Sequence, residues 1–242
     1  MIEENIGFLL DIIRLIVGVL ILGYASYTDI KTRRASNMLW IIMATAGGFL
    51  LIIQYLTIGF NNPLQLLMIP LMIGFAYILF QLRLIFGGAD AKAIMALSIL
   101  APFHPTINNE LPLWSSMMPF PWIIFSNSII LFLIIPLALL LYNIAKHDLE
   151  LPYCLLGYKM SIDKAKKTFV WPLEQITNNG MRRFVYMPKD FDIEEELKEF
   201  EKRKIQKIWV TPKIPFMIPL LIGFITSFTL GDILFHLMNS II

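Results

Sequence analysis

The sequence predicts an all-α membrane protein with six transmembrane helices and a small α+β insertion between the fifth helix and the sixth. Hydrophobic residues make up 57% of the 242 residues and charged residues only 16%, against about 25% in an ordinary soluble domain. The hydrophobic residues also occur in runs of about 20, the length at which a helix crosses a bilayer with its backbone groups satisfied internally. One long polar stretch, residues 143–215, precedes the last run. This composition excludes a disordered chain, a fibrous chain and an ordinary water-soluble enzyme.

Five runs are long enough to span the membrane. They cover residues 6–27, 37–56, 64–86, 122–142 and 216–237. A sixth run, residues 89–103, reaches only about 22 Å as a helix, less than the roughly 30 Å of the hydrocarbon core. Its length alone is compatible with a short span or with a segment that re-enters the same face.

The basic residues favour a span for the short run. If it spans, the loops after the first, third and fifth helices share one face, which then receives every Lys and Arg except Arg14. The positive-inside rule makes this face cytoplasmic. We therefore expect a multi-pass protein of the cell membrane with both termini outside. The start of the chain is acidic (Glu3, Glu4), unlike a cleavable signal peptide, so we expect the first helix to be retained.

The polar stretch predicts a small cytoplasmic insertion. Residues 168–176 and 181–187 read as two strands around a turn sequence, and Pro172 restricts the first of them to a sheet edge. Residues 192–208 read as a helix with acidic residues early and basic residues late, an order that complements the helix dipole. We interpret the acidic cluster over residues 190–201 as a solvated face in preference to a site for a basic peptide. The chain then divides into residues 1–142, 143–215 and 216–242.

Four carboxylates lie in or beside the predicted spans, where burial of a charge is costly. They are Asp11, Asp29, Asp90 and Asp232. Asp11 lies three residues before Arg14, on the same helix face, so we expect an ion pair with a structural role. Asp232 lies one turn before His236 near the outer end of the last helix, and it either orients that histidine or sits at the interface.

Asp29 and Asp90 are the more informative carboxylates. Asp29 ends the first span and Asp90 opens the fourth, so the topology puts both at the cytoplasmic boundary. Taken singly, Asp29 is explained by pairing with Lys31, Arg33 or Arg34, and Asp90 by a capping role at a helix N-terminus. Their matched depth favours a working pair, because two carboxyl groups that share a proton can activate water and polarise a peptide carbonyl.

Other features limit the chemistry further. Gly87 and Gly88 lie just before Asp90, where glycine allows unusual backbone angles and close approach of another chain. The single cysteine, Cys154, excludes an intramolecular disulfide and a cysteine-based zinc site. The three histidines are far apart, so we expect no metal and no cofactor. The net charge of +2 gives no support for a nucleic-acid partner.

These residues resemble a known family in two segments. Gly87-Gly88-Ala89-Asp90-Ala91-Lys92 is similar to the Gly-x-Gly-Asp signature of intramembrane aspartic proteases, with alanine in place of the second signature glycine. In type IV prepilin peptidases, the first catalytic aspartate is followed eight residues later by Asn, and Asn37 stands at that distance from Asp29. Ser36 stands where those enzymes usually have Pro. The size, span count and late insertion are similar to the archaeal members, the preflagellin (prearchaellin) peptidases.

The resemblance implies an aspartic endopeptidase that acts in archaellum biogenesis. Its substrate would be a preflagellin or pilin-like precursor, cleaved at the cytoplasmic face between a basic leader and an apolar helix in the bilayer. Asp29 and Asp90 would be catalytic, with supporting roles for Gly87, Gly88, Lys92 and Asn37. The prepilin enzymes that also methylate their product often carry four zinc-binding cysteines, so the lone Cys154 makes that second activity unexpected.

Two other classes of function stay open at this stage. A transporter could use the carboxylates as a cation site, although such sites tend to lie near the membrane midplane between internal repeats. An assembly scaffold could bind partners through the insertion and would tolerate loss of both aspartates.

Overall fold

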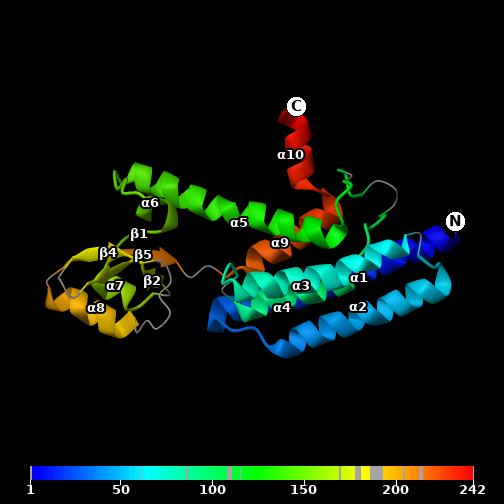
Figure 1. The fold of residues 1–242 in the computed structure, drawn as a ribbon, viewed down its shortest axis with the longest axis horizontal. Coiled ribbons are helices and arrows are strands. Elements are labelled where there is room, and N and C mark those ends of the chain that lie inside the picture. The colour runs from blue at the N-terminus through cyan, green and yellow to red at the C-terminus, as the bar shows by residue number, and fades with distance from the viewer. Residues whose placement is uncertain are drawn as a thin grey trace. The chain divides into compact units, whose positions relative to one another are not determined.

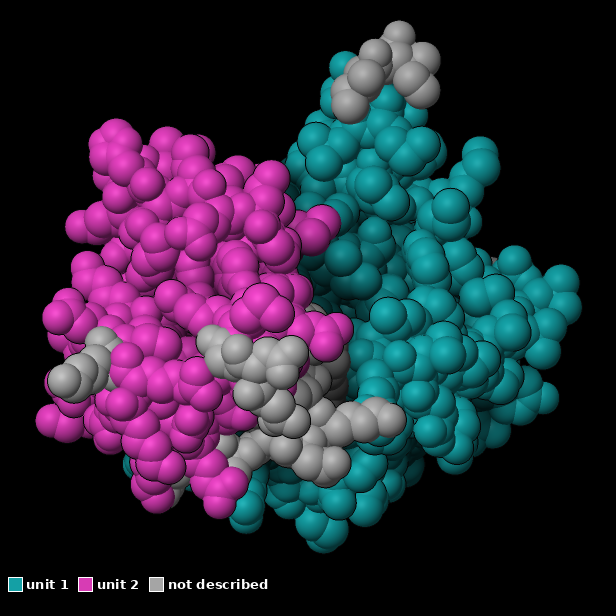
Figure 2. Space-filling view, turned by 60° about the vertical axis from the view of Figure 1, so that its left-hand side comes forward, with its two compact units in different colours: residues 1–132, 215–242 teal, residues 133–214 magenta. Residues whose placement is uncertain are grey.

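The computed structural model describes most of the chain. The described ranges are residues 2–60, 62–85, 87–107, 111–114, 116–168, 170–177, 181–185, 193–203, 205–212 and 215–241. The chain divides into two compact units, which Figure 2 distinguishes by colour. We call residues 1–132 with 215–242 the helical unit, and residues 133–214 the insertion unit.

Among the described residues, four helical segments are long and apolar enough to cross a membrane. They are α1 (Ile2–Thr32), α2 (Asn37–Thr57), η1 with α3 (Pro63–Leu67 and Met68–Gln81) and α5 (Phe120–Ala145). Each coincides with one of the predicted spans. Large apolar side chains such as Leu20, Phe49 and Leu71 are more than half exposed. Apolar surface of this kind is suited to lipid, and the four helices make the chain a membrane protein.

The short predicted span corresponds to α4 (Gly88–Leu100), which packs along α2 and α3 (Figure 1). Its 13 residues extend about 20 Å, so a total of six membrane crossings stays a prediction. Small side chains such as Ala91 and Ala96 are buried against its neighbours. A Cβ atom added to Gly47 of α2 would lie 2.9 Å from the carbonyl carbon of Ile99. The backbones of α2 and α4 are therefore in close contact at this point.

The expectation of one continuous helix over residues 216–237 was wrong. The chain forms α9 (Met217–Thr229) and then α10 (Ile233–Ile241), which points in a different direction in Figure 1. Gly231 lies between them with a φ of +95°. The buried side chain of Asn127 in α5 donates to the Gly231 carbonyl (2.7 Å) and accepts from the first N–H of α10 (3.2 Å). A side chain thus satisfies the backbone groups that the break releases.

The larger sheet of the insertion unit has three antiparallel strands. β5 (Lys207–Pro212) lies between β1 (Tyr158–Ser161) and β2 (Val170–Pro172). The single-turn helices α6 (Tyr153–Leu156) and α7 (Ile162–Ala165) lie before and after β1. Because β2 pairs within this sheet only with β5, the predicted edge position of Pro172 is confirmed.

The smaller sheet pairs β3 (Glu174–Ile176) with β4 (Arg182–Phe184). These strands enclose the predicted turn, of which residues 178–180 lie outside the described part, as do the last two residues of the predicted second strand. The predicted strand 168–176 is divided into β2 and β3 at Leu173. Its N–H donates to the Trp209 carbonyl and its own carbonyl accepts from the N–H of Val185 (2.9 Å each), so this residue joins the two sheets.

The predicted helix over residues 192–208 was too long. α8 covers Ile193–Lys202, and the chain then enters β5 at Lys207. Leu197 and Phe200 of α8 are buried against the larger sheet. Several acidic side chains of α8 pair with basic or amide groups of the same unit, as Glu201 does with Lys166. Asp190 and Asp192 of the predicted acidic cluster lie outside the described residues.

Candidate active site

Asp29 lies in the last turn of α1 and is partly exposed. The helix ends where Arg33 adopts a φ of 56°, with its N–H donating to the Asp29 carbonyl (2.9 Å). Among the three basic residues that sequence reasoning left open, Arg33 is the one whose charge acts on the Asp29 carboxyl. Lys31 instead donates to the Tyr27 hydroxyl (3.3 Å). The short turn after α1 therefore holds a guanidinium near this carboxylate.

Asp90 lies in the first turn of α4, with Gly87 at the N-cap position. A Cβ atom added to Gly87 would lie 2.9 Å from Cγ of Asp90 and nearer still to Oδ2. A side chain at this position would displace the Asp90 carboxyl from the place it occupies. At Gly88 an added Cβ would meet only the Phe80 ring, at 3.6 Å, which is an ordinary contact. The two neighbouring glycines therefore contribute very differently to the site.

Neither glycine uses the unusual backbone angles that its lack of a side chain allows. Gly87 has φ −93° and ψ 116°, which any residue can adopt, and Gly88 is the first residue of an ordinary helix. The close approach that glycine allows does occur at Gly87, but it is made by the Asp90 side chain of the same segment.

The two aspartates lie at the same end of the helical unit. α1 and α4 pack together, and the charge of Asp29 acts on the Asp90 carboxyl. No hydrogen bond joins the two carboxyl groups to each other within the described part of the chain. Two acids from different helices thus share one end of the unit while remaining separate.

Lys92 and Asn37 are in direct contact although they are far apart in the sequence. Lys92 Nζ donates to Asn37 Oδ1 (2.9 Å), which joins the first turn of α4 to the first residue of α2. Asn37 is positioned by Ser36, the N-cap of α2, whose Oγ accepts from the N–H of Met38 (3.3 Å). Ser36, which departs from the family motif, therefore has a structural role of its own. Serine before an apolar helical run is itself a capping signal.

The other intramembrane carboxylates have structural partners. Asp11 pairs with Arg14 (3.0 Å), so the predicted ion pair is confirmed. Asp232 accepts from Ser116 Oγ (2.6 Å) and caps α10 through the N–H of Phe235 (3.1 Å). The structure gives Asp232 no side-chain bond to His236, whose ring instead stacks on Trp114 with centroids 3.9 Å apart. The described residues contain no group of three or more His, Cys, Asp or Glu placed to hold a metal ion.

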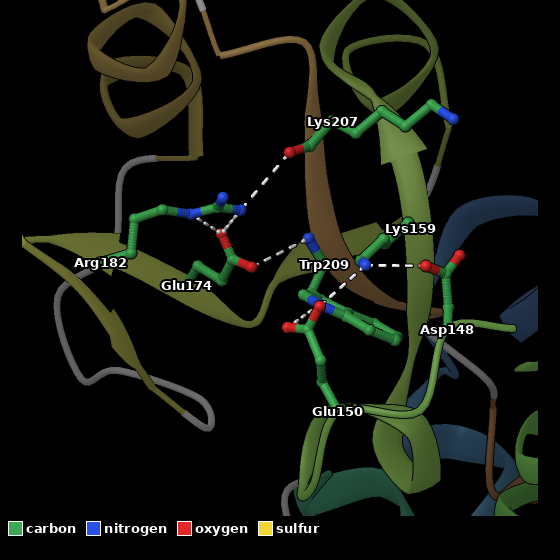
Figure 3. A network of polar contacts seen from close by, with 7 residues as sticks. All are labelled: Asp148, Glu150, Lys159, Glu174, Arg182, Lys207 and Trp209. Atoms are coloured by element: carbon green, nitrogen blue, oxygen red, sulfur yellow. Dashed lines mark hydrogen bonds and ion pairs between the residues drawn. The ribbon is translucent and has the colours of Figure 1, made fainter.

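The insertion unit has a polar network of its own (Figure 3). Lys159 donates to Asp148 (2.7 Å) and Glu150 (2.9 Å), and its ammonium lies 5.1 Å from the ring centroid of Trp209. The indole N–H of Trp209 also donates to Glu150 (3.2 Å). The hydrogen bond from Lys159 lowers the pKa of Glu150. A lysine of the edge strand β1 is thus held between two carboxylates and an aromatic ring.

A second part of the same network is buried more deeply. Glu174 is only 3% exposed. Its carboxylate accepts from Arg182 Nε (2.8 Å) and Nη2 and from the backbone N–H of Trp209 (3.4 Å). Burial raises the pKa of Glu174, and the Arg182 guanidinium acts in the opposite direction. These contacts fasten the small sheet to the larger one, which is a structural role.

The described helices thus form an apolar bundle with two acids at one end. Comparison with known proteins identifies the family. Residues 16–144 match the model of the type IV leader peptidase family, and residues 149–233 match the archaeal peptidase A24 C-terminus, type II. The chain belongs to the type IV leader peptidase family, as its motifs predicted. It is therefore a protease that processes leader peptides, and the transporter and scaffold alternatives lose their support.

Three relatives are similar along nearly their whole length, and each is described as a preflagellin peptidase. The protein from Methanococcus voltae is 29% identical over 89% of this chain and 94% of its own length. The protein from Methanocaldococcus jannaschii is 27% identical over 95% and 98% respectively. The protein from Methanococcus maripaludis is 25% identical over 91% and 96%.

Proposed function

We propose that this protein is an aspartic endopeptidase that removes the basic leader from preflagellin or pilin-like precursors. The observation that carries the proposal is the joint placement of Asp29 and Asp90 at one end of an apolar bundle, in a chain of the leader peptidase family. Support for the substrate comes from the three preflagellin peptidases that match this chain over most of its length.

The proposed mechanism uses the two carboxyls as an acid–base pair. One, ionised, takes a proton from a water molecule as that water attacks the scissile carbonyl carbon. The other, protonated, donates a hydrogen bond to the carbonyl oxygen and stabilises the negative charge that develops there. The proton is then passed to the leaving amine as the peptide bond breaks. No metal and no covalent intermediate is needed for this sequence.

The neighbouring residues are proposed to position the pair. Gly87 leaves the space that the Asp90 carboxyl occupies, and Gly88 begins α4 beside the Phe80 ring. Lys92 and Asn37 hold the starts of α4 and α2 together. We place the whole catalytic site within residues 1–142, and the insertion 143–215 between the fifth and sixth membrane segments.

The site is proposed to face the cytoplasm, with both termini outside. The basic residues of the chain support this orientation, since nearly all of them follow the first, third or fifth span. Water and the basic leader would then enter from the cytosol, while the apolar helix of the precursor stays in the bilayer. Because no described hydrogen bond joins the two carboxyls, we further propose that substrate binding draws them together.

The test uses purified full-length protein and a preflagellin precursor with its leader. We expect Asp29→Asn and Asp90→Asn each to abolish cleavage, measured as the loss of the shorter product on a gel. Asp163→Asn, an exposed aspartate of α7, is the matched control and should cleave normally. Thermal unfolding of all three variants should resemble that of the wild type. Full cleavage by either active-site variant would refute the aspartic mechanism.

A further inference from the structure

A cavity of about 280 Å³ lies in the helical unit far from the two active-site aspartates. It is bounded by the start of α1, the end of α2 and the segments around residues 60–65 and 103–106. Asp11, which lines it, precedes Asp29 by about 27 Å along α1. The cavity therefore belongs to the opposite end of the unit, and cleavage as proposed above makes no use of it.

Two nearly buried charges form its inner wall. Arg14 and Asp11 are 3% and 7% exposed and pair at 3.0 Å. Asp11 also accepts from the N–H of Thr106 (3.0 Å), and Arg14 donates to Gln54 Oε1 (2.6 Å). The positive and negative charges cancel, and the network fixes their orientation. Nε of Arg14 is buried with no hydrogen-bond partner among the described residues.

Hydrogen-bond donors also line the cavity. The side-chain oxygens of Gln54 and Asn62 accept from Arg14 and from the N–H of Leu64, which leaves the amide nitrogen of each as a donor without a partner in the described part of the chain. Gln65 makes no side-chain hydrogen bond to any described residue. Three amide groups, one from α2 and two from the start of η1, thus line one small space. Donors in such a position favour a ligand that is rich in oxygen acceptors.

Aromatic rings complete the wall. Phe60 and Phe103 lie side by side with ring centroids 5.2 Å apart and an interplanar angle of 34°. The volume is slightly below the roughly 300–1,000 Å³ of pockets for drug-sized ligands, so it suits a single small ring. A strongly charged ligand is disfavoured because the buried charges are already balanced.

We infer that this cavity binds a polyhydroxylated ring, a sugar of hexose size. Its hydroxyl oxygens would accept from the three amides and from Arg14, its hydroxyl hydrogens would be donated to Asp11, and its C–H face would lie on Phe60 or Phe103. Such a ring is supplied either as the headgroup of a membrane glycolipid or as a free sugar.

The experiment measures binding to the full-length protein in phosphatidylglycerol nanodiscs. One arm includes a monoglucosyl diacylglycerol in the nanodisc, and a second arm adds methyl glucoside to the solution. A third arm adds inorganic phosphate. Lipid retained in native mass spectrometry and the shift of the unfolding temperature are the readouts. If the glycolipid binds and methyl glucoside does not, the ligand is a lipid headgroup. If both bind, a free sugar is also a ligand of the cavity.

Gln65→Met is the test variant, because it removes an amide with no described structural partner at nearly constant volume. We expect its affinity for the sugar to fall about three- to tenfold, the loss of one hydrogen bond. Gln81→Met, on α3 outside the cavity, is the matched control and should bind as the wild type does. The inference is overturned if neither sugar binds, if phosphate binds in their place, or if Gln65→Met binds sugar undiminished.

Discussion

Substitution of Gly87 by alanine tests the geometry around Asp90 most directly. The φ and ψ of Gly87 suit alanine, so the backbone is not strained. The new Cβ would lie 2.9 Å from Cγ of Asp90, whereas carbon atoms in contact are about 3.5–4.0 Å apart. The carboxyl must therefore move by roughly 0.6–1 Å, and a misplacement of that size lowers catalytic rates by about 100-fold.

The assay compares rates of precursor cleavage by Gly87→Ala and Gly88→Ala. The second variant is the control, because its Cβ meets only the Phe80 ring at 3.6 Å. Alanine also has a higher helix propensity than glycine. We expect Gly88→Ala to retain activity within a few-fold of the wild type and both variants to unfold at similar temperatures. The reasoning is refuted if Gly87→Ala cleaves at the wild-type rate, or if the two variants are equally impaired.

Three further predictions concern other parts of the molecule. Lys92→Met removes the hydrogen bond to Asn37 and should lower kcat for precursor cleavage about tenfold, with less than about 1 kcal/mol of lost stability. Lys92→Arg should retain more activity, and an equal loss of activity in both variants would contradict a positioning role. Arg14→Met leaves Asp11 buried without its partner and should lower the unfolding free energy by about 3–5 kcal/mol, measured by denaturant titration in detergent; an unchanged midpoint would contradict the importance of this pair. Because the pKa of Glu150 in the folded protein lies below its ordinary value of 4.5, its stabilising contribution is present above pH 4.5 and is lost as pH falls through the lowered value. Tryptophan fluorescence should therefore show a larger acid-induced loss of stability in the wild type than in Glu150→Gln, and parallel curves would argue against the link.

Local signals in the sequence predicted much of this architecture. The runs that became α1, α2, α3 and α5 needed only length and hydropathy, since a helix in lipid satisfies its own backbone. Pro172 predicted an edge strand because proline has no backbone N–H to donate to a neighbouring strand. The placement of Asp29 and Asp90 at the same end of the helical unit followed from counting residues along helices from a common boundary.

The features that were missed depend on contacts distant in the sequence. Residues 207 and 208 were interpreted as the end of the acidic helix, but they begin β5. This strand pairs with strands about 40 and 50 residues earlier, and that pairing selects the extended conformation. The break at Gly231 had a local signal, a glycine followed by a capping aspartate. Hydropathy alone predicted one continuous helix, because the residues on both sides of the break are apolar. The Asn127 side chain that accommodates the break comes from another helix.

The enclosure of α4 has a mechanical consequence. This helix packs against α1, α2 and α3, and its backbone lies close to Gly47 of α2. The position of Asp90 is therefore fixed by the helices around α4. The last turn of α1 has no such surroundings, and Ile30, Lys31 and Thr32 are exposed. If the two acids draw closer when a precursor arrives, the travel belongs to Asp29, and the hinge lies within the few residues between α1 and α2.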